Sequence, residues 1–199
     1  CEAFSTTATV TVQPDYLSGY CYRKKVIIDP NQVSGNTDLT NFPMLFSSTD
    51  PDLRTTANNG QVTNASGYDI KFTDAGGTEL DHEIESYTAG TGNFIAWVRV
   101  PTVSVTENTV LYMHYGNSSV ATDPSVASTW DSNFKAIWHF EDNLLDATTN
   151  DNDGTEGSPG STDDEIGIIS HGRGFTGVNN GDSWISVANS ASIDTDISN

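Results

Sequence analysis

Apolar and polar residues alternate along many short stretches of this chain, which is the period of a half-buried β-strand. The clearest stretch is residues 94–100, FIAWVRV, in which both faces of the expected strand carry apolar side chains. We therefore expect this strand at the centre of a sheet. Further strands are predicted at residues 22–28, 70–73, 80–87 and 109–115. Apart from a short segment near residues 125–130, no stretch keeps apolar residues at helical spacing for three turns. The pattern therefore predicts an all-β fold that begins with an antiparallel, jelly-roll-like β-sandwich.

A second set of elements follows residues 118–132, which have the composition of a linker. In chain order, the first is an aromatic strand at residues 134–140, followed by a polar loop at residues 146–154 and a low-complexity stretch at residues 155–165. Two strands joined by a turn come last, at residues 172–178 and 183–187. We expect the low-complexity stretch to be exposed. The pattern thus predicts two β-rich modules in one chain.

Residues 5–14 form a further alternating stretch before the first module. Residues 8, 10 and 12 are apolar, and Pro14, which lacks an amide donor, ends the pairing. One strand cannot bury its apolar face alone, so we expect it to pack on the next module or to be mobile. It resembles the last strand of an immunoglobulin-like repeat. Because the chain has no Met start and no signal sequence, we expect an excised piece of a longer protein.

Three blocks of the sequence resemble, in this order, a module of large bacterial surface proteins. The blocks are YRKKVIID at residues 22–29, LDHEIESY at residues 80–87 and WDSNFKAIWHF at residues 130–140. The module is the domain-of-unknown-function family numbered 2341, followed by a laminin-G-like or concanavalin A-like lectin domain.

This resemblance implies a division of the chain into three parts. Residues 1–15 are the final strand of an immunoglobulin-like repeat with its linker. Residues 16–132 are a jelly-roll-like domain of family 2341, and residues 133–199 are the N-terminal part of a concanavalin A-like sandwich. Such lectin domains continue with several more strands, so the second sandwich is expected to be incomplete at Asn199.

The charge of the chain excludes some classes of partner. It carries 27 acidic and 8 basic residues, a net charge of -19. The resulting field repels phosphate backbones and anionic lipid, and no apolar run approaches the ~18 residues needed to cross a bilayer. We expect neither nucleic acid binding nor membrane insertion. Residues 135–199 carry 12 acidic and 2 basic residues, a higher density of negative charge than residues 1–134 with 15 and 6.

This acidic second part contains candidate ligands for calcium, which prefers hard oxygen donors on loops. The candidates are Asp146, Asn150, Asn152 and Asp153 on the polar loop, and Asp182 on a later turn. The loop lacks the pattern of an EF-hand, and the alternative is a solvated acidic surface. Some laminin-G-like domains hold calcium near such loops, so the resemblance also implies calcium as the one cofactor.

Acidic residues alternate along residues 79–85, and on a strand they are expected to share one face. They are Glu79, Asp81, Glu83 and Glu85. The pattern E-x-D-x-E resembles the catalytic strand of retaining glycosidases, which needs two carboxyl groups about 5 to 5.5 Å apart. Glu79 and Glu83 reach that separation only by leaning together or through a bulge. We instead expect a solvated face, or a surface that pairs with the basic residues 23–25, and no catalysis.

The other reactive side chains indicate no enzyme. The four histidines lack the short spacings of zinc ligands. Aromatic rings can stack on sugars, but we expect the four tryptophans to lie mostly in the core. They are Trp97, Trp130, Trp138 and Trp184.

The two cysteines, Cys1 and Cys21, are candidates for a disulfide in an oxidising compartment. Two alternatives remain open from the sequence. Cys1 pairs with Cys21, or it pairs with a cysteine that precedes this chain.

Resemblance and composition together predict a non-catalytic segment of a secreted, multidomain adhesin on the bacterial cell surface, of the kind used by gliding or surface-colonising cells. Its expected roles are those of a stalk between neighbouring domains and of a module that binds glycans or another surface through its lectin-like part. Two alternatives are an accessory carbohydrate-binding module of a secreted polysaccharide-degrading enzyme and a structural filament or surface-layer subunit.

Overall fold

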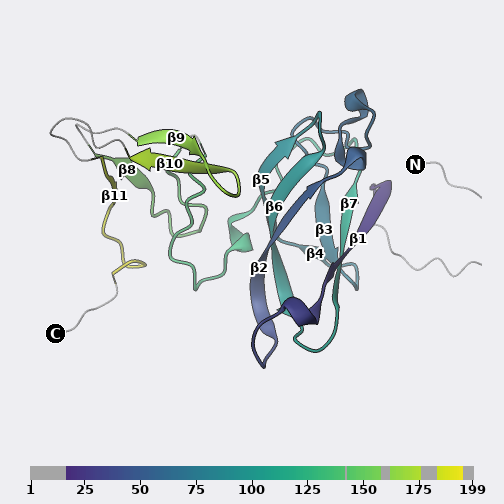
Figure 1. Ribbon diagram of the computed structural model, residues 1–199, viewed down its shortest axis with the longest axis horizontal. Helices are drawn as coiled ribbons and strands as arrows, with labels where there is room; N and C mark the ends of the chain where they lie inside the picture. Colours follow the sequence, from purple (N-terminus) through teal and green to yellow (C-terminus); the bar gives the residue numbers. More distant parts are fainter. Residues whose placement is uncertain (1–16, 142, 158–161, 176–182, 195–199) are drawn as a thin grey trace, which may run out of the picture. The chain divides into compact units, whose positions relative to one another are not determined.

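The computed structural model describes residues 17–141, 143–157, 162–175 and 183–194, and the chain divides into two units between Thr129 and Trp130 (Figure 1). The strand predicted at residues 5–14 lies outside the described residues. All paired strands that the structure describes are antiparallel, and its helical segments are 3-10 turns of three residues. The predicted all-β fold is confirmed. No helix in the described part of the chain is long and apolar enough to span a membrane.

Unit 1 is built from two sheets that pack face to face. Its strands are β1 (Tyr22–Ile28), β2 (Leu39–Thr49), β3 (Lys71–Asp74), β4 (Glu79–Leu80), β5 (His82–Thr88), β6 (Asn93–Val103) and β7 (Thr109–Tyr115). One sheet has the order β1-β7-β3-β4 and the other β2-β6-β5. Its short 3-10 turns are η1 (Pro30–Gln32), η2 (Pro51–Leu53), η3 (Thr56–Asn58) and η4 (Ala127–Thr129).

Aromatic side chains from both sheets meet in the core between them. Phe72 of β3 lies with its ring centroid 5.4 Å from that of Phe46 of β2 and 6.4 Å from that of Phe94 of β6. Phe72 and Phe94 are completely buried. Rings at these separations add to the stability that comes from removing their apolar surface from water.

β6 has the central position that its sequence predicts. It pairs with β2 on one side and with β5 on the other. Its alternate residues Phe94, Ala96, Val98 and Val100 are buried, whereas the residues between them are half-buried. Alternation along this strand therefore identified the face that enters the core.

The stretch predicted as one strand at residues 80–87 is divided between the two sheets. β4 ends at Leu80 and β5 begins at His82, so the chain crosses from one sheet to the other at Asp81. A register shift lies between Ile84 and Ser86. Glu85, between these two residues, is buried, and its Oε2 accepts a hydrogen bond from Nε1 of Trp97, a residue of the β6 face that does not enter the core, at 3.0 Å. Glu83 is the cross-strand partner of Trp97, and Glu85 bonds to the same side chain, so these two acidic residues share the outer face. The expectation of a solvated face is wrong at Glu85, because this residue is buried.

Of the basic residues of β1, Lys24 has ion-pair partners outside the β4–β5 stretch. Lys24 pairs with Asp50 and Asp52, and the Arg23 guanidinium lies 4.0 Å from the centre of the Tyr112 ring.

Unit 2 contains two small sheets. Its described strands are β8 (Gly154–Glu156), β9 (Thr162–Ile166), β10 (His171–Phe175) and β11 (Ile185–Val187). β9 pairs with β10, and β8 pairs with β11. The predicted strands at residues 172–178 and 183–187 thus correspond to β10 and β11, but they do not pair with each other.

One further expectation for unit 2 is wrong. Residues 134–140 are not a strand, because hydrogen bonds from the polar loop hold this segment: Ile137 N–H donates to Asp146 Oδ1, and Ile137 O accepts from Ala147 N–H. The low-complexity stretch is exposed at residues 155, 156, 164 and 165, as expected, and β9 extends into it and pairs with β10. The likeness of unit 2 to a concanavalin A-like sandwich stays a prediction.

Candidate functional site

A polar pocket of about 580 Å³ lies at one end of unit 1. Its walls come from the turn that precedes β1, from β3 and β4, and from residues 117–126, which follow β7. Side chains of opposite charge, Lys71 and Glu79, form an ion pair on the wall, and Asn117 and Asp123 add an amide and a carboxylate. The pocket therefore offers both hydrogen-bond donors and acceptors to a ligand.

The segment 117–126 is fastened to the sandwich along its length. Asn117 N–H donates to Asp69 Oδ2 at 3.2 Å, and Asn64 Nδ2 donates to the carbonyl of Val120 at 3.2 Å. Near its end, Val126 N–H donates to the carbonyl of His82 at 3.2 Å. These bonds hold the wall in place before any ligand arrives, so binding has less ordering cost to overcome.

The carboxylate of Asp69 anchors this arrangement. Asp69 is completely buried and also accepts bonds from Thr63 N–H at 2.8 Å, Thr63 Oγ1 at 2.6 Å and Asn64 N–H at 3.0 Å. A buried carboxylate is tolerated only when hydrogen bonds replace its hydration. Asp69 thereby fixes the backbone at residues 63–64 and at Asn117 together.

Tyr20 forms part of the opposite wall. Its ring is buried, with its centroid 6.2 Å from that of His114, and its hydroxyl has no hydrogen-bond partner within the described ranges. Burial raises the pKa of Tyr20, and the negative charges of Glu79 and Asp69 raise it further. The preceding position favours glycine, because Gly19 has a φ of +88° and a Cβ there would lie 2.8 Å from Asn117 Nδ2.

His114 lies behind Tyr20 as a neutral imidazole. Leu17 N–H donates to its Nδ1 at 3.4 Å, so its Nε2–H is the donor to Thr73 Oγ1 at 3.0 Å. Burial lowers the pKa of His114 to about 4, with a smaller contribution from Arg23, although Glu79 acts in the opposite direction. The pocket thus rests on an uncharged histidine at neutral pH.

The residues predicted to bind calcium meet in one loop of unit 2, apart from Asp182, which lies outside the described residues. Both carboxylate oxygens of Asp146 are occupied. Oδ1 accepts from Ile137 N–H and Thr148 N–H, each at 2.9 Å, and Oδ2 accepts from Thr148 Oγ1 at 2.8 Å and Asn152 N–H at 2.9 Å. Asp146 thus organises the loop, as Asp69 does in unit 1.

The other candidate ligands extend this network. Asn150 Nδ2 donates to the carbonyls of Phe134 and Lys135, Asn152 Nδ2 donates to Lys135 and Ser192, and Asp153 Oδ1 accepts from Asp146 N–H. In the ranges that the structure describes, no group of three or more His, Cys, Asp or Glu side chains is placed to hold a metal ion. Calcium binding stays a prediction.

The candidate disulfide also stays a prediction. Cys21 directly precedes β1, and Cys1 lies outside the described residues.

Unit 2 also has an apolar cleft of about 400 Å³. Its apolar lining consists of Trp138, Phe140, Phe175, Trp184, Ile185 and Val187. The expectation that the tryptophans lie in the core is wrong for Trp184, which is 43% exposed. Trp138 Nε1 donates to the carbonyl of Asn152 at 3.0 Å, so the polar atom of this ring is already satisfied.

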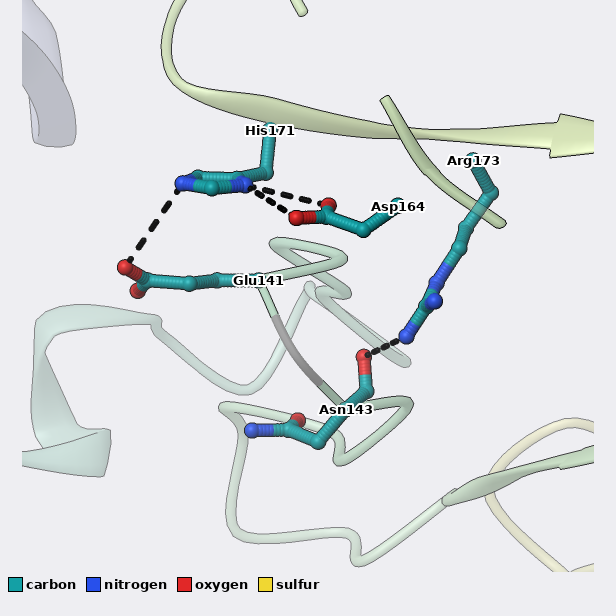
Figure 2. A network of polar contacts seen from close by, with 5 residues as sticks. All are labelled: Glu141, Asn143, Asp164, His171 and Arg173. Atoms are coloured by element: carbon teal, nitrogen blue, oxygen red, sulfur yellow. Dashed lines mark hydrogen bonds and ion pairs between the residues drawn. The ribbon is translucent and has the colours of Figure 1, made fainter. Parts of the chain in front are cut away.

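Polar contacts hold the β9–β10 hairpin against residues 141 and 143 (Figure 2). His171 Nδ1 lies 3.0 Å from both carboxylate oxygens of Asp164, and its Nε2 lies 3.9 Å from Glu141 Oε1. Arg173 donates to the carbonyl of Asn143 at 3.3 Å. The hairpin is thus attached at two positions along β10.

One comparison with known proteins gives a match. Residues 66–152 match the family model described as a domain of unknown function (DUF2341). No curated protein and no solved structure matches the chain. The DUF2341 match includes Asp69, both charged residues of the ion pair and the whole segment 117–126, and it continues into unit 2 as far as Asn152. It supports the first part of the resemblance to family 2341.

Sequence reasoning missed the pocket because it assigned residues 118–132 to a linker. Two signals were available in the sequence. Asp69 stands between the turn-forming residues 64–67 and the apolar Ile70, which precedes β3, and Gly19 precedes an aromatic residue. Neither signal indicates which distant segment the residue contacts.

The buried histidine predicts a pH dependence for unit 1. The unfolded state takes up a proton near pH 6.5, whereas folded His114 does so only near pH 4, so stability falls as the pH drops through this window. We expect a loss of roughly 3 kcal/mol from this group. In His114→Gln the free energy of unfolding, measured by hydrogen exchange of peptides from β3 and β7, should depend less on pH. His171→Gln in unit 2 is the control and should leave the dependence unchanged. An equal slope in wild type and His114→Gln would contradict the assignment.

The Asp146 network predicts a large effect of an isosteric change. In Asp146→Asn an amide group replaces one acceptor oxygen and faces backbone donors, so unit 2 should lose about 2 kcal/mol or more of unfolding free energy. Asp151→Asn is the matched control, because Asp151 is an exposed residue of the same loop, and it should change stability by less than about 0.5 kcal/mol. Denaturant unfolding with hydrogen exchange of unit 2 peptides measures both. Equal losses of unfolding free energy in the two variants would contradict the structural role of Asp146.

Calcium binding by this loop is checked separately. Addition of calcium should release or absorb heat in a calorimetric titration and raise the melting temperature of the chain, because an ion that binds the folded state stabilises it. Asp153→Asn should weaken this response. Absence of heat together with an unchanged melting temperature at millimolar calcium would overturn the prediction.

Proposed function

We propose that this chain is a non-catalytic segment of a secreted, multidomain bacterial surface adhesin, and that it binds glycans in the polar pocket of unit 1. The observation that carries the proposal is the chemistry of that pocket. Its volume of about 580 Å³ lies within the range of small-ligand sites, roughly 300 to 1,000 Å³.

A sugar needs two kinds of contact. Its hydroxyl groups must exchange hydrogen bonds with the protein when they leave water, and its C–H faces favour apolar surface. Lys71, Glu79 and Asn117 offer the polar contacts. Leu17 and Val120 offer apolar surface in the same pocket. This combination suits a hydroxyl-rich ligand.

The cleft of unit 2 suits such a ligand less well, although aromatic rings line it. Ser183 is the one polar residue among the described residues that line it. A sugar in this cleft would leave most of its hydroxyl groups without partners, which costs free energy. We therefore assign the glycan to unit 1 and not to the lectin-like part that the resemblance favoured.

The acidic residues of the β4–β5 stretch support a non-catalytic role. Glu79 pairs with Lys71, and Asp81 lies 4.0 Å from Arg99. Glu85 is buried and holds the Trp97 ring. A retaining glycosidase needs one carboxylate as a nucleophile and a second as an acid, about 5 to 5.5 Å apart across the substrate. Glu79 is held in an ion pair and Glu85 accepts a hydrogen bond from an indole N–H, so these two carboxylates already have partners.

The net charge of -19 is consistent with a neutral glycan. It opposes contact with nucleic acid and anionic lipid, because like charges repel over a Debye length of about 8 Å at physiological salt. Such charge also keeps an extracellular protein soluble.

A pocket-filling variant tests the proposal. The intact chain is applied to a glycan array, and the bound glycan is then titrated by calorimetry. Ala121→Trp places a large side chain on an exposed residue of the pocket wall and should lower the affinity at least about tenfold, or roughly 1.4 kcal/mol.

Ala57→Trp is the matched control. Ala57 is also an exposed alanine of unit 1, but it does not line the pocket, so the affinity should not change. Absence of any glycan that binds above background would defeat the proposal. Binding that survives Ala121→Trp but is lost in Trp184→Ser would place the site in unit 2 instead.

A further inference from the structure

The turn of the β9–β10 hairpin exposes isoleucine side chains. Residues 167–170 connect the two strands, and a hydrogen bond from Gly167 N–H to the carbonyl of Ser170 closes the turn. Ile166 and Ile168 are fully exposed, and Ile169 is 38% exposed. Single exposed apolar residues are common, but a cluster of three at a protruding turn indicates a contact surface.

The hairpin is held in a defined position and presents this turn. His171, next to the turn, contacts Asp164 and Glu141, and Arg173 contacts Asn143 (Figure 2). Because β10 is attached at two positions, the isoleucines form a preorganised surface, which reduces the entropy lost on binding.

The same unit contains a cleft of matching chemistry. Its apolar lining includes Trp138, Phe140, Phe175 and Trp184, and its volume of about 400 Å³ corresponds to roughly a dozen water molecules. The Trp184 ring is held over Gly157, where a Cβ would lie 1.9 Å from a ring atom. An aliphatic side chain that entered the cleft would displace water from its largely apolar lining, which is favourable.

Within one copy the turn does not reach this cleft while the hairpin is formed. Phe175 of the cleft ends β10, whereas the turn lies beyond His171 at its other end. The four-residue separation along the strand spans roughly 13 Å. The isoleucine turn and the apolar cleft therefore lie at opposite ends of β10.

We propose that unit 2 associates head to tail with a second copy of this chain, with the turn residues Ile166, Ile168 and Ile169 of one copy seated in the aromatic cleft of the next. Each copy has one turn and one cleft, so the contact is heterologous, and it leaves one surface of each kind open at the ends of a dimer. Longer assemblies follow by repetition. The occupant is a second copy because both complementary surfaces are on this chain.

Electrostatics sets how this association depends on salt. Every copy carries the same net charge of -19, and Asp164 and Glu165 lie beside the turn. Like charges oppose the approach of two copies, and salt screens this repulsion while it leaves the apolar contact intact. The association should therefore strengthen with salt, whereas a contact made by ion pairs would weaken.

Sedimentation velocity on the full chain, over micromolar to millimolar concentrations, tests the proposal at low salt and at about 0.5 M NaCl. Wild type should form dimers and larger species that increase with concentration and with salt. Ile168→Ser should weaken the association at least tenfold. Ile27→Ser is the matched control, because Ile27 is an exposed isoleucine of unit 1, and it should change nothing.

Mixing two defective variants gives the sharpest test. Ile168→Ser lacks the protruding side chain, Trp184→Ser lacks a wall of the cleft, and each variant alone should remain monomeric. The turn is intact in Trp184→Ser and the cleft is intact in Ile168→Ser. An equal mixture of the two variants should therefore form dimers, but no species larger than a dimer.

Several results would overturn the proposal. They are a wild type that stays monomeric under all these conditions, association that salt weakens, and association that Ile168→Ser leaves unchanged. Association retained by Trp184→Ser alone would indicate contact between two turns and would also refute the arrangement. The glycan pocket of unit 1 shares no residue with this contact, so the two proposals fail independently.

Discussion

Buried carboxylates that accept several backbone hydrogen bonds are the constraint on which both units depend. Asp69 in unit 1 and Asp146 in unit 2 each accept four hydrogen bonds, and each joins segments that are not strands. A chain with few helices and many loops leaves backbone donors unpaired, and a buried donor without a partner is costly. In each unit, one aspartate carboxylate accepts hydrogen bonds from several of these donors.

The same constraint positions the surfaces that we assign to function. Asp69 fixes the start of the segment 117–126, which forms the wall of the polar pocket. Asp146 fixes the segment that carries Trp138 and Phe140, which line the apolar cleft. The two surfaces differ in chemistry, one with paired charges and amides and the other almost entirely apolar, so they suit different partners.

Alternation in the sequence predicted the strands well where a strand stays within one sheet. β6 is the best example, because its buried face follows the period of two from Phe94 to Val100. The same reasoning failed between residues 79 and 85. There the chain changes sheets at Asp81 and the register shifts between Ile84 and Ser86, and the sequence of polar and apolar residues marks neither event. Residues 118–132 were predicted to link two modules, and the boundary between the units does fall in this range, but the polar composition did not indicate that residues 117–126 also form a pocket wall.

The sequence by itself determined the strand-built class, the acidic surface and the face of β6 that enters the core, since these depend on the period and composition of neighbouring residues. Only the tertiary structure decided which loops Asp69 and Asp146 hold, that Tyr20 and Glu79 face one pocket, and that Trp184 lies in an open cleft. The physical reason is that these contacts join residues far apart in the chain, and local patterns contain no information about which distant backbone donors or rings will meet a given side chain.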